Sequence, residues 1–177
     1  MHHPFTISSS PGDPYLRLSA KAIGDFTKKI PQIKKNSPVL ISGPYGLFTS
    51  GVAIKKRRLF IAGGIGVTPI RSMLGNRIKK GDVLIYAAKT EADLAFKKEF
   101  DEMSEKGLKV VYVLSDEKRS WAKNGHITKG ILYDKVPKLV SRDVWLCGPP
   151  PMMKSVKSAL KELGVPKNQV HTEEFRL

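Results

Sequence analysis

The sequence predicts an α/β fold: a Rossmann-like parallel sheet of five strands, preceded by a partial antiparallel β segment. Two observations indicate the sheet. From residue 58 onwards, short apolar runs typical of strands alternate with amphipathic stretches typical of helices, and glycine-containing turns separate them. Strands that alternate with helices at this spacing need a parallel sheet covered on both faces, because each crossing helix must bury its apolar side.

Residues 1–57 have a different pattern, in which β-forming runs are broken by turns. FTISS, YLRLSAKA and PVLISG are the expected strands, PGDP and KKNSP the turns, and GDFTKKI one short helix. So few elements make a poor independent domain, because a thin core and open edges leave it marginal. We therefore predict a boundary near the basic cluster KKRR, which gives a first domain of residues 1–57 and a second of residues 58–177. The first is expected to be part of something larger.

The second domain is predicted to contain five strands and four helices. The strands are RLFIAG, DVLIYAA, LKVVYVLS, DVWLCG and NQVHTEEF. The helices are TPIRSMLGNRI, DLAFKKEFDEMSEK, ITKGILYDKV and PMMKSVKSALKELG. The second helix has an apolar stripe at helical spacing, formed by Leu94, Phe96, Phe100 and Met103.

Composition indicates an ordinary globular protein. Hydrophobic residues make up 41% and charged residues 27%, which argues against disorder. No apolar run approaches the roughly 18 to 20 residues of a membrane span, and the N-terminus lacks the features of a signal peptide. The single cysteine, Cys147, has no partner for an internal disulfide, which fits a reducing compartment. We expect a cytoplasmic location, with the cytoplasmic face of a membrane as one possibility.

The formal net charge of +15 raises the alternative of a nucleic-acid-binding protein. The basic residues are densest in residues 1–57, with nine Lys or Arg against two Asp. No stripe of aromatic residues between basic ones accompanies them, so a nucleic-acid partner is not expected. A basic surface of this kind suits an acidic protein, anionic lipid or the phosphates of a cofactor, or is simply solvated.

Three glycines, Gly63, Gly64 and Gly66, stand where the first strand of the second domain leads into a helix. Glycine there allows close backbone approach and leaves N–H groups at the positive end of a helix, which suits a pyrophosphate. The run GGIG lacks the full spacing of a dinucleotide fingerprint, so a purely structural tight turn is the alternative.

The stretch CGPPPMM marks a second candidate site. It places Cys147 and Gly148 at the carboxyl end of a predicted parallel strand, where ligands of open α/β sheets bind. The alternative is that Cys147 is a small buried hydrophobic residue with no part in binding.

Taken together, the motifs resemble the ferredoxin-NADP reductase superfamily. They are HPFTISS at 3–9, GPYG at 43–46, GGIGVTP at 63–69, CGPPPMM at 147–153 and EEF at 173–175. The HPFT sequence is most similar to the ferric reductase and NADPH oxidase branch. The resemblance implies that residues 1–57 are the C-terminal part of an FAD-binding β-barrel. Such a barrel would begin roughly 80 to 100 residues earlier, so the N-terminal half is expected to be absent.

The resemblance also implies which residues contact the flavin. His3, Pro4, Phe5 and Thr6 match the flavin-binding element, in which Phe5 packs on the ring and Thr6 hydrogen-bonds near flavin N5. His3 replaces the usual arginine and would hold phosphate less strongly, because imidazole is mostly neutral at pH 7. The remaining matches are Gly24 and Thr27, at a helix start that receives the pyrophosphate, and Gly43 and Gly46, in the turn that links the domains.

For the nicotinamide dinucleotide, the resemblance implies a second set of residues. The pyrophosphate loop comprises Gly63, Gly64, Gly66, Val67 and Thr68, and Cys147, Gly148 and Pro149 lie beside the nicotinamide. Phe175 matches an aromatic residue that covers the flavin and gives way to nicotinamide, and Glu173 matches an acidic position before it. The alternative is that Phe175 caps a core. The implied catalytic set is Thr6, Cys147, Glu173 and Phe175.

The leading hypothesis is an NAD(P)H-dependent flavin oxidoreductase with FAD as cofactor and no metal site. Hydride would pass from NADH or NADPH to FAD, and electrons would then leave to haem, ferric iron, oxygen or an iron–sulfur protein. A haem-containing membrane segment or protein is one expected partner. The alternative is a nucleotide-binding electron-transfer module or subunit that works only within a larger reductase.

The choice between NADH and NADPH depends on the residues after the third strand of the second domain. Ser115 is a residue type that grips a 2′-phosphate in the superfamily, but Asp116 and Glu117 follow it and would repel that phosphate. Lys118 and Arg119 come next and could offset them. The balance favours NADH slightly.

Overall fold

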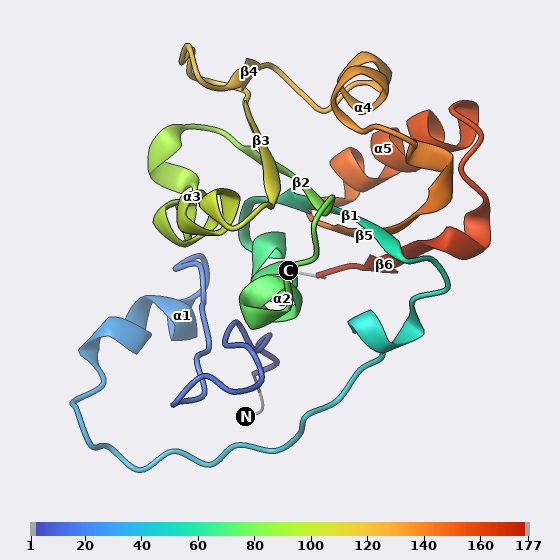
Figure 1. Cartoon of the computed structure of the whole chain (residues 1–177). Coiled ribbons are helices and arrows are strands. Elements are labelled where there is room, and N and C mark those ends of the chain that lie inside the picture. The colour runs from blue at the N-terminus through green and yellow to red at the C-terminus, as the bar shows by residue number, and fades with distance from the viewer. Residues whose placement is uncertain (1–2, 176–177) are drawn as a thin grey trace.

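A six-stranded parallel sheet forms the centre of the computed structural model, which describes residues 3–175 (Figure 1). The strand order is β4-β3-β2-β1-β5-β6. The strands are β1 (Arg57–Gly63), β2 (Val83–Ala88), β3 (Lys109–Leu114), β4 (Lys123–Asn124), β5 (Arg142–Cys147) and β6 (Val170–Glu173). The predicted parallel α/β fold is confirmed. The two-residue β4, which pairs with the end of β3 at the sheet edge, was not predicted, because two exposed polar residues carry no hydrophobic pattern.

Four helices cover the two faces of this sheet. They are α2 (Val67–Leu74), α3 (Lys97–Glu105), α4 (Lys129–Lys135) and α5 (Pro150–Glu162). Alternate strand residues point to opposite faces, so Phe60 packs with α2 and α3 while Leu59 and Ile61 pack with α4 and α5. Figure 1 shows the two helix pairs on opposite sides of the strands. Both faces therefore carry a buried apolar core, as a parallel sheet requires.

Helices α2, α3 and α4 are all shorter than predicted, and the backbone explains the ends of α2 and α3. Helix α2 ends at Leu74 because Gly75 leaves the helical conformation, with φ 16° and ψ −117°, and a 3₁₀ turn, Gly75–Arg77, follows. Helix α3 begins at Lys97 because Phe96 is left-handed, with φ 61°. The residues before it form the 3₁₀ turn Glu91–Asp93. The local backbone, and not the apolar pattern, sets both helix ends.

The N-terminal part contains less β-structure than predicted. One antiparallel bridge, between Ile7 and Leu18, joins the first two expected strands. The expected strand PVLISG is wrong: it has no strand partner among residues 3–175, and Leu40 is 100% exposed. A strand needs a hydrogen-bonded neighbour as well as a suitable sequence. The predicted short helix is confirmed as α1 (Asp25–Lys29).

Residues 48–55 connect the N-terminal part to the sheet through two anchors on β5. Trp145 Nε1 donates to the Thr49 carbonyl over 3.2 Å, and the buried Asp143 Oδ2 accepts the backbone N–H of Ile54 over 2.7 Å and that of Lys55. These bonds fix the point at which the chain enters β1. Within residues 3–175, no helix combines the length and apolarity that a membrane crossing needs.

Candidate functional site

The carboxyl ends of the parallel strands bring several predicted residues to one edge of the sheet. In the strand register, Ala62 of β1 lies beside Cys147 of β5, and Cys147 lies beside Glu173 of β6. The chain continues from β1 to β2 on one side, whereas β5 lies on the other side of β1. The carboxyl ends of β1 and β5 thus form a topological switch point, where open α/β sheets bind their ligands.

The three loop glycines have different structural roles. A Cβ at Gly66 would lie 2.5 Å from the Cys147 carbonyl oxygen, and a Cβ at Gly63 would lie 2.6 Å from Met152 Sδ. These two positions need glycine for close packing within the chain. Gly64 differs, because its φ is +51° and a Cβ there would meet no atom within 4 Å. The open side of Gly64 is where a ligand can approach the backbone.

Val67 and Thr68 follow the loop at the start of α2, and both are buried. The Thr68 hydroxyl donates to the Ile65 carbonyl over 3.0 Å. Their side chains therefore stabilise the loop, and only backbone N–H groups of this turn are suited to an anionic ligand. Their predicted contact with the dinucleotide stays a prediction.

Cys147 is fully buried, and its thiol is neutral at physiological pH. Burial, and then the negative charge of Glu173, raise the pKa of Cys147 to about 12. A thiol in this state is a poor nucleophile. Gly148 packs closely as well, because a Cβ there would lie 2.6 Å from Met152 Cε. Pro149 is exposed at the N-cap of α5. These residues form a tight, uncharged wall at the carboxyl end of β5.

Glu173 and Phe175 lie at the end of β6. Glu173 is half-buried and helps to line a cavity of about 270 Å³ together with Leu47, Phe48, Val52, His171 and Thr172. Phe175 is the last residue that the structure describes and is half-buried beyond the strand. Its predicted role as a flavin cover stays a prediction.

On the flavin side, the structure brings the first two predicted elements together. The His3 ring stacks on Phe26 with centroids 3.7 Å apart, and Phe5 lies 6.2 Å from the same ring. Pro4 is exposed and Thr6 half-buried. Phe26 belongs to α1, so residues 3–6 lie beside the turn that contains Gly24 and Thr27.

The Thr27 hydroxyl accepts the backbone N–H of Gly24 over 3.0 Å and so caps α1. Gly43 and Gly46 both have positive φ, of 138° and 96°. Tyr45 between them is 84% exposed. Among the described residues, no hydrogen bond joins this turn to residues 3–6 or to α1. The structure therefore unites two of the three predicted flavin elements.

The end of β3 carries an ion-pair cluster that the sequence did not predict. Arg119 pairs with Glu91 over 3.1 Å and also with Glu117, and Glu117 accepts the backbone N–H of Glu91 over 2.6 Å. Ser115 Oγ lies 2.5 Å from Asp116 Oδ1. Arg119 was expected to offset the carboxylates that follow Ser115. Its guanidinium is instead neutralised by Glu91 and Glu117.

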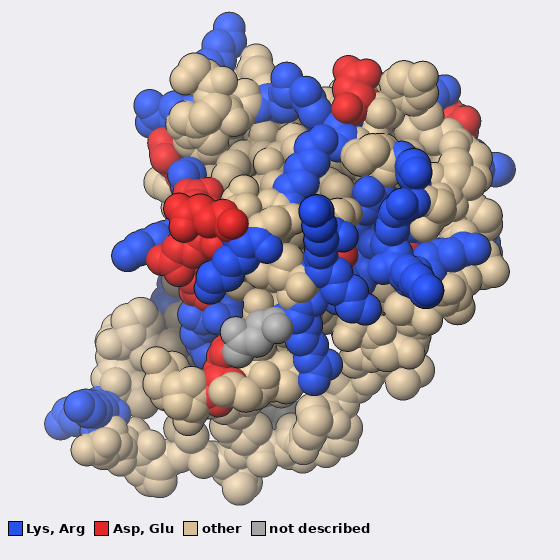
Figure 2. Space-filling model, viewed as in Figure 1, with Lys and Arg blue, Asp and Glu red and all other residues tan. Residues whose placement is uncertain are grey.

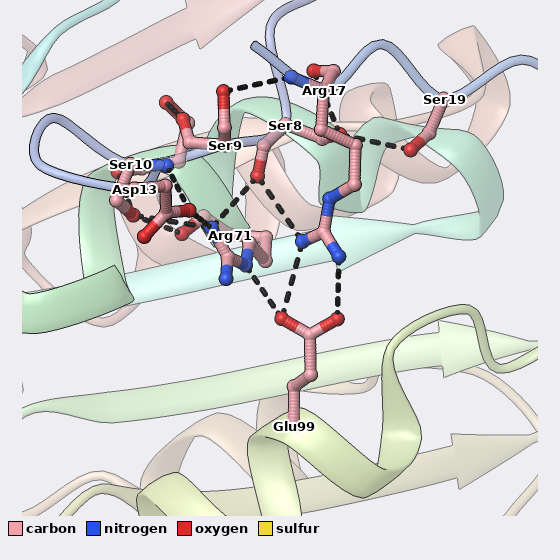
Figure 3. Close-up of polar contacts among 9 residues, drawn as sticks. Ser8, Ser9, Ser10, Asp13, Arg17, Ser19, Arg71 and Glu99 are labelled. Atoms are coloured by element: carbon pink, nitrogen blue, oxygen red, sulfur yellow. Dashed lines mark hydrogen bonds and ion pairs between the residues drawn. The ribbon is translucent and has the colours of Figure 1, made fainter. Parts of the chain in front are cut away.

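A second missed cluster joins residues 8–19 to helices α2 and α3, with Arg71 at its centre (Figure 3). The one available signal was a charged residue inside a helix whose neighbours Val67, Ile70 and Leu74 are all fully buried. On the face that Figure 2 shows, Lys and Arg side chains are widely spread, and acidic side chains form a few small groups. Such a field favours the approach of an anionic ligand.

Comparison with known proteins agrees with this geometry. Residues 60–158 match the family model of the oxidoreductase NAD-binding domain, and residues 1–49 match that of an FAD-binding domain. The NADH-cytochrome b5 reductase 1 of Scheffersomyces stipitis is 36% identical over 81% of this chain and 54% of its own length. The glycine betaine monooxygenase reductase subunit of Chromohalobacter salexigens is 30% identical over 97% of this chain and 50% of its own length. The chain thus spans about half the length of these curated relatives.

Solved structures share the fold. A ferredoxin NADP+ reductase from Neisseria gonorrhoeae with bound FAD and NADP superposes with a TM-score of 0.80 at 16% identity, over 96% of this chain and 78% of that one. The NAD-binding family model alone covers residues 60–158, more than half of the 177 residues. The chain therefore belongs to the oxidoreductase NAD-binding domain family, within the ferredoxin-NADP reductase-like superfamily.

Proposed function

We propose that this chain is the reductase part of a flavoenzyme that takes hydride from NADH onto FAD and delivers electrons to a protein acceptor. The observation that carries the proposal is the switch point, where Gly66 and Gly63 pack against Cys147 and Gly148 while the side of Gly64 stays open. FAD, when bound, supplies the ring that accepts hydride and releases electrons singly.

In this proposal the chain's residues bind, orient and exclude water. The backbone around Gly64 receives the dinucleotide pyrophosphate, and the Cys147–Gly148 wall faces the nicotinamide. The neutral Cys147 thiol adds no negative charge beside the donor. On the other side, Phe5 and Thr6 would contact the flavin ring, Gly24 and Thr27 its pyrophosphate, and Phe175 would cover it. Residues 1–57 would be the flavin-binding portion and residues 58–177 the dinucleotide-binding portion.

The ion pairs of Arg119 support NADH as the donor. A 2′-phosphate near Asp116 would meet a carboxylate, and the nearby guanidinium is held by Glu91 and Glu117. A free ribose 2′-hydroxyl can instead donate a hydrogen bond to a carboxylate. NADPH would therefore bind more weakly than NADH.

For the acceptor of the electrons, we propose either a haem-carrying protein or an oxygenase. Two curated relatives are named for cytochrome b5 and for a monooxygenase. The HPFT element at residues 3–6 supports a place near the ferric reductase branch, whose acceptor would be haem in a membrane. A location at the cytoplasmic face of a membrane would fit that acceptor and the basic surface. The second candidate is a nucleotide-binding module without activity of its own, because the chain spans about half the length of these relatives.

The test is calorimetry of the purified chain with NADH and with NADPH, followed by addition of FAD. We expect NADH to bind at least fivefold more tightly than NADPH, and bound FAD to lose its absorbance band when NADH is added without oxygen. Binding of NADH without retention of FAD would favour the module. A chain that binds neither dinucleotide would refute both candidates.

A further inference from the structure

A network of ion pairs centred on Arg71 attaches the N-terminal segment, residues 8–19, to helices α2 and α3 (Figure 3). Arg71 Nη1 donates to the Ser8 carbonyl over 3.1 Å and pairs with Asp13 Oδ2 over 2.6 Å. Its Nε pairs with Glu99 Oε2 of α3 over 2.7 Å. One guanidinium on α2 thus holds both the N-terminal segment and the neighbouring helix.

Arg17 completes the network from the other side. Its Nη1 and Nη2 contact the two oxygens of Glu99 over 2.8 and 3.1 Å, and its guanidinium lies 4.6 Å from the Phe96 ring centroid. The network contains two arginines and two carboxylates and is therefore neutral. The pKa of Glu99 is lowered although burial opposes this, because Arg17 and Arg71 both hydrogen-bond to its carboxylate. The Arg71 side chain is only 12% exposed, so salt and water weaken these pairs little.

Serine contacts also hold the N-terminal segment against the C-terminal half of α2. Ser10 Oγ donates to the Ser72 carbonyl over 2.9 Å, and Ser72 Oγ donates to the Ser9 carbonyl over 2.7 Å. A Cβ at Gly75 would lie 1.6 Å from Ser10 Oγ, so glycine is required for this approach. The segment is therefore packed closely against the end of α2, and any displacement of it would break several bonds.

Polar contacts are the main attachment of this segment. Within residues 3–56, the buried residues are Ser8, Ser9 and Ser10, and none is apolar. The position of the segment against α2 and α3 therefore depends on hydrogen bonds and ion pairs, and the strength of these bonds depends on their geometry. This differs from a hydrophobic contact, which tolerates small displacements.

Residues of the network lie only a few positions along the chain from each of the two candidate cofactor elements. Arg71 follows Thr68 of the glycine loop by three residues in one rigid helix, and Ser8 follows Thr6 of the flavin element by two residues. A helix rises about 1.5 Å per residue and an extended chain about 3.3 Å, so Arg71 lies a short distance from Thr68 and Ser8 a short distance from Thr6. We infer that Arg71 is a positioning residue that sets the distance between the flavin-binding element and the dinucleotide loop.

This inference rests on the proposed function, because a positioning residue matters only if hydride passes between the two elements. Hydride transfer is very sensitive to distance, and a displacement of about 1 Å can lower its rate on the order of a hundredfold. Loss of Arg71 should therefore slow transfer without weakening the binding of NADH, because the Arg71 guanidinium is engaged by Ser8, Asp13 and Glu99, which lie outside the predicted dinucleotide site.

The test compares Arg71→Gln with the matched control Arg57→Gln in the full chain. Arg57 is exposed at the start of β1, and its guanidinium contacts Ser141 Oγ over 3.5 Å. Spin labels at Pro4→Cys and Ser155→Cys, both exposed positions, report the distance between the N-terminal segment and α5. Hydrogen exchange of residues 8–19 and of β1 reports local and global opening separately.

We expect Arg71→Gln to broaden the distance distribution and to speed exchange in residues 8–19 at least tenfold, with β1 unchanged. In the FAD-loaded chain, hydride transfer from NADH should slow at least tenfold while its Kd changes less than twofold. Arg71→Lys should give an intermediate result, because an ammonium cannot form the same forked contacts. Arg57→Gln should match the parent throughout.

An unchanged distance distribution in Arg71→Gln would overturn the inference. A changed distribution with an unchanged transfer rate would also overturn it, because the network would then be structural only. If the parent chain fails to bind NADH, the proposed function fails and no positioning role exists, whereas the distance and exchange measurements still decide whether Arg71 holds the segment. The two failures are therefore distinguishable.

Discussion

Gly66 lies so close to Cys147 that a Cβ on the glycine would be 2.5 Å from the cysteine carbonyl oxygen. The turn after β1 is thus packed against the end of β5, and backbone atoms cannot move aside as a flexible side chain would. Gly66→Ala should lower the free energy of unfolding by about 2 to 3 kcal/mol. Urea denaturation of the purified variant would measure this. A loss below about 0.5 kcal/mol would mean that the turn adjusts and that the close approach is not required.

Gly64→Ala is the complementary change, because the new methyl group would point into open space. The positive φ of 51° should cost about 1 kcal/mol of stability, and the fold should be retained. In the proposed function, the methyl would occupy the side from which the pyrophosphate approaches, so NADH affinity should fall at least tenfold. Calorimetry with an intact circular dichroism spectrum would test this. Gly64→Val should give the same loss of affinity with a larger loss of stability. Unchanged affinity would remove Gly64 from the binding site.

Burial of Cys147 predicts a dependence of stability on alkaline pH. Its pKa is raised from the ordinary value to about 12 in the folded chain, because burial and Glu173 disfavour the thiolate. The folded state therefore keeps a proton that the unfolded state loses above about pH 9. The resulting stabilisation is full below that pH and is lost as pH rises towards 12, by about 1.4 kcal/mol per pH unit.

The measurement compares the parent with Cys147→Ala between pH 8 and about 10.5. The variant should show a shallower loss of stability with pH, although it starts less stable because the sulfur leaves a small cavity. The parent thiol should also resist iodoacetamide until the chain unfolds. Equal slopes, or rapid alkylation of the folded chain, would contradict the neutral buried thiol.

Phe175 gives a prediction about the end of the chain. If it covers the flavin, deletion of residues 175–177 should let nicotinamide stack on the ring more readily and raise NADPH use relative to NADH. The comparison should be made in a version that includes a complete flavin-binding domain. Deletion of residues 176–177 alone is the control. Spectra and kinetics equal to those of the parent would mean that Phe175 belongs to the core.

The parallel sheet was predictable because its signal is local. Runs such as LFIA in β1 and VLIY in β2 are buried strands, and each is followed by a helix with one apolar face. The error at PVLISG has the opposite cause: the sequence favours a strand, but strand formation needs a neighbour, and the described residues supply none.

The candidate site was predictable in part for the same reason. The glycine turn and the end of β5 each carry a local motif, and parallel topology brings them to one edge. The assignment of Gly63 and Gly66 to intrachain packing was not predictable, because it depends on Met152 and Cys147. Pairs such as Arg71 with Asp13 join residues 58 positions apart. Long-range ion pairs leave no periodic pattern in a sequence.

The last prediction concerns the choice of donor and depends on Arg119. Its guanidinium is held by Glu91 and Glu117, so it is not free to contact a 2′-phosphate. Glu117→Gln removes one of the two charges, and Glu91 alone should hold the arginine less firmly. The kcat/KM for NADPH should then rise about fivefold to tenfold in the flavin-complete protein, because a freed arginine near a phosphate contributes about 1 to 1.5 kcal/mol. The value for NADH should change less than twofold.

Two controls separate this explanation from a general change in charge. Lys118→Ala removes a neighbouring charge that forms no ion pair among the described residues, and it should leave the preference for NADH in place. The double variant Glu117→Gln with Arg119→Ala should lose the gain with NADPH, because the gain requires the freed guanidinium. If the parent already uses NADPH tenfold better than NADH and Arg119→Ala abolishes that preference, then the arginine reaches the phosphate despite its two carboxylates. The proposed preference for NADH would then be wrong.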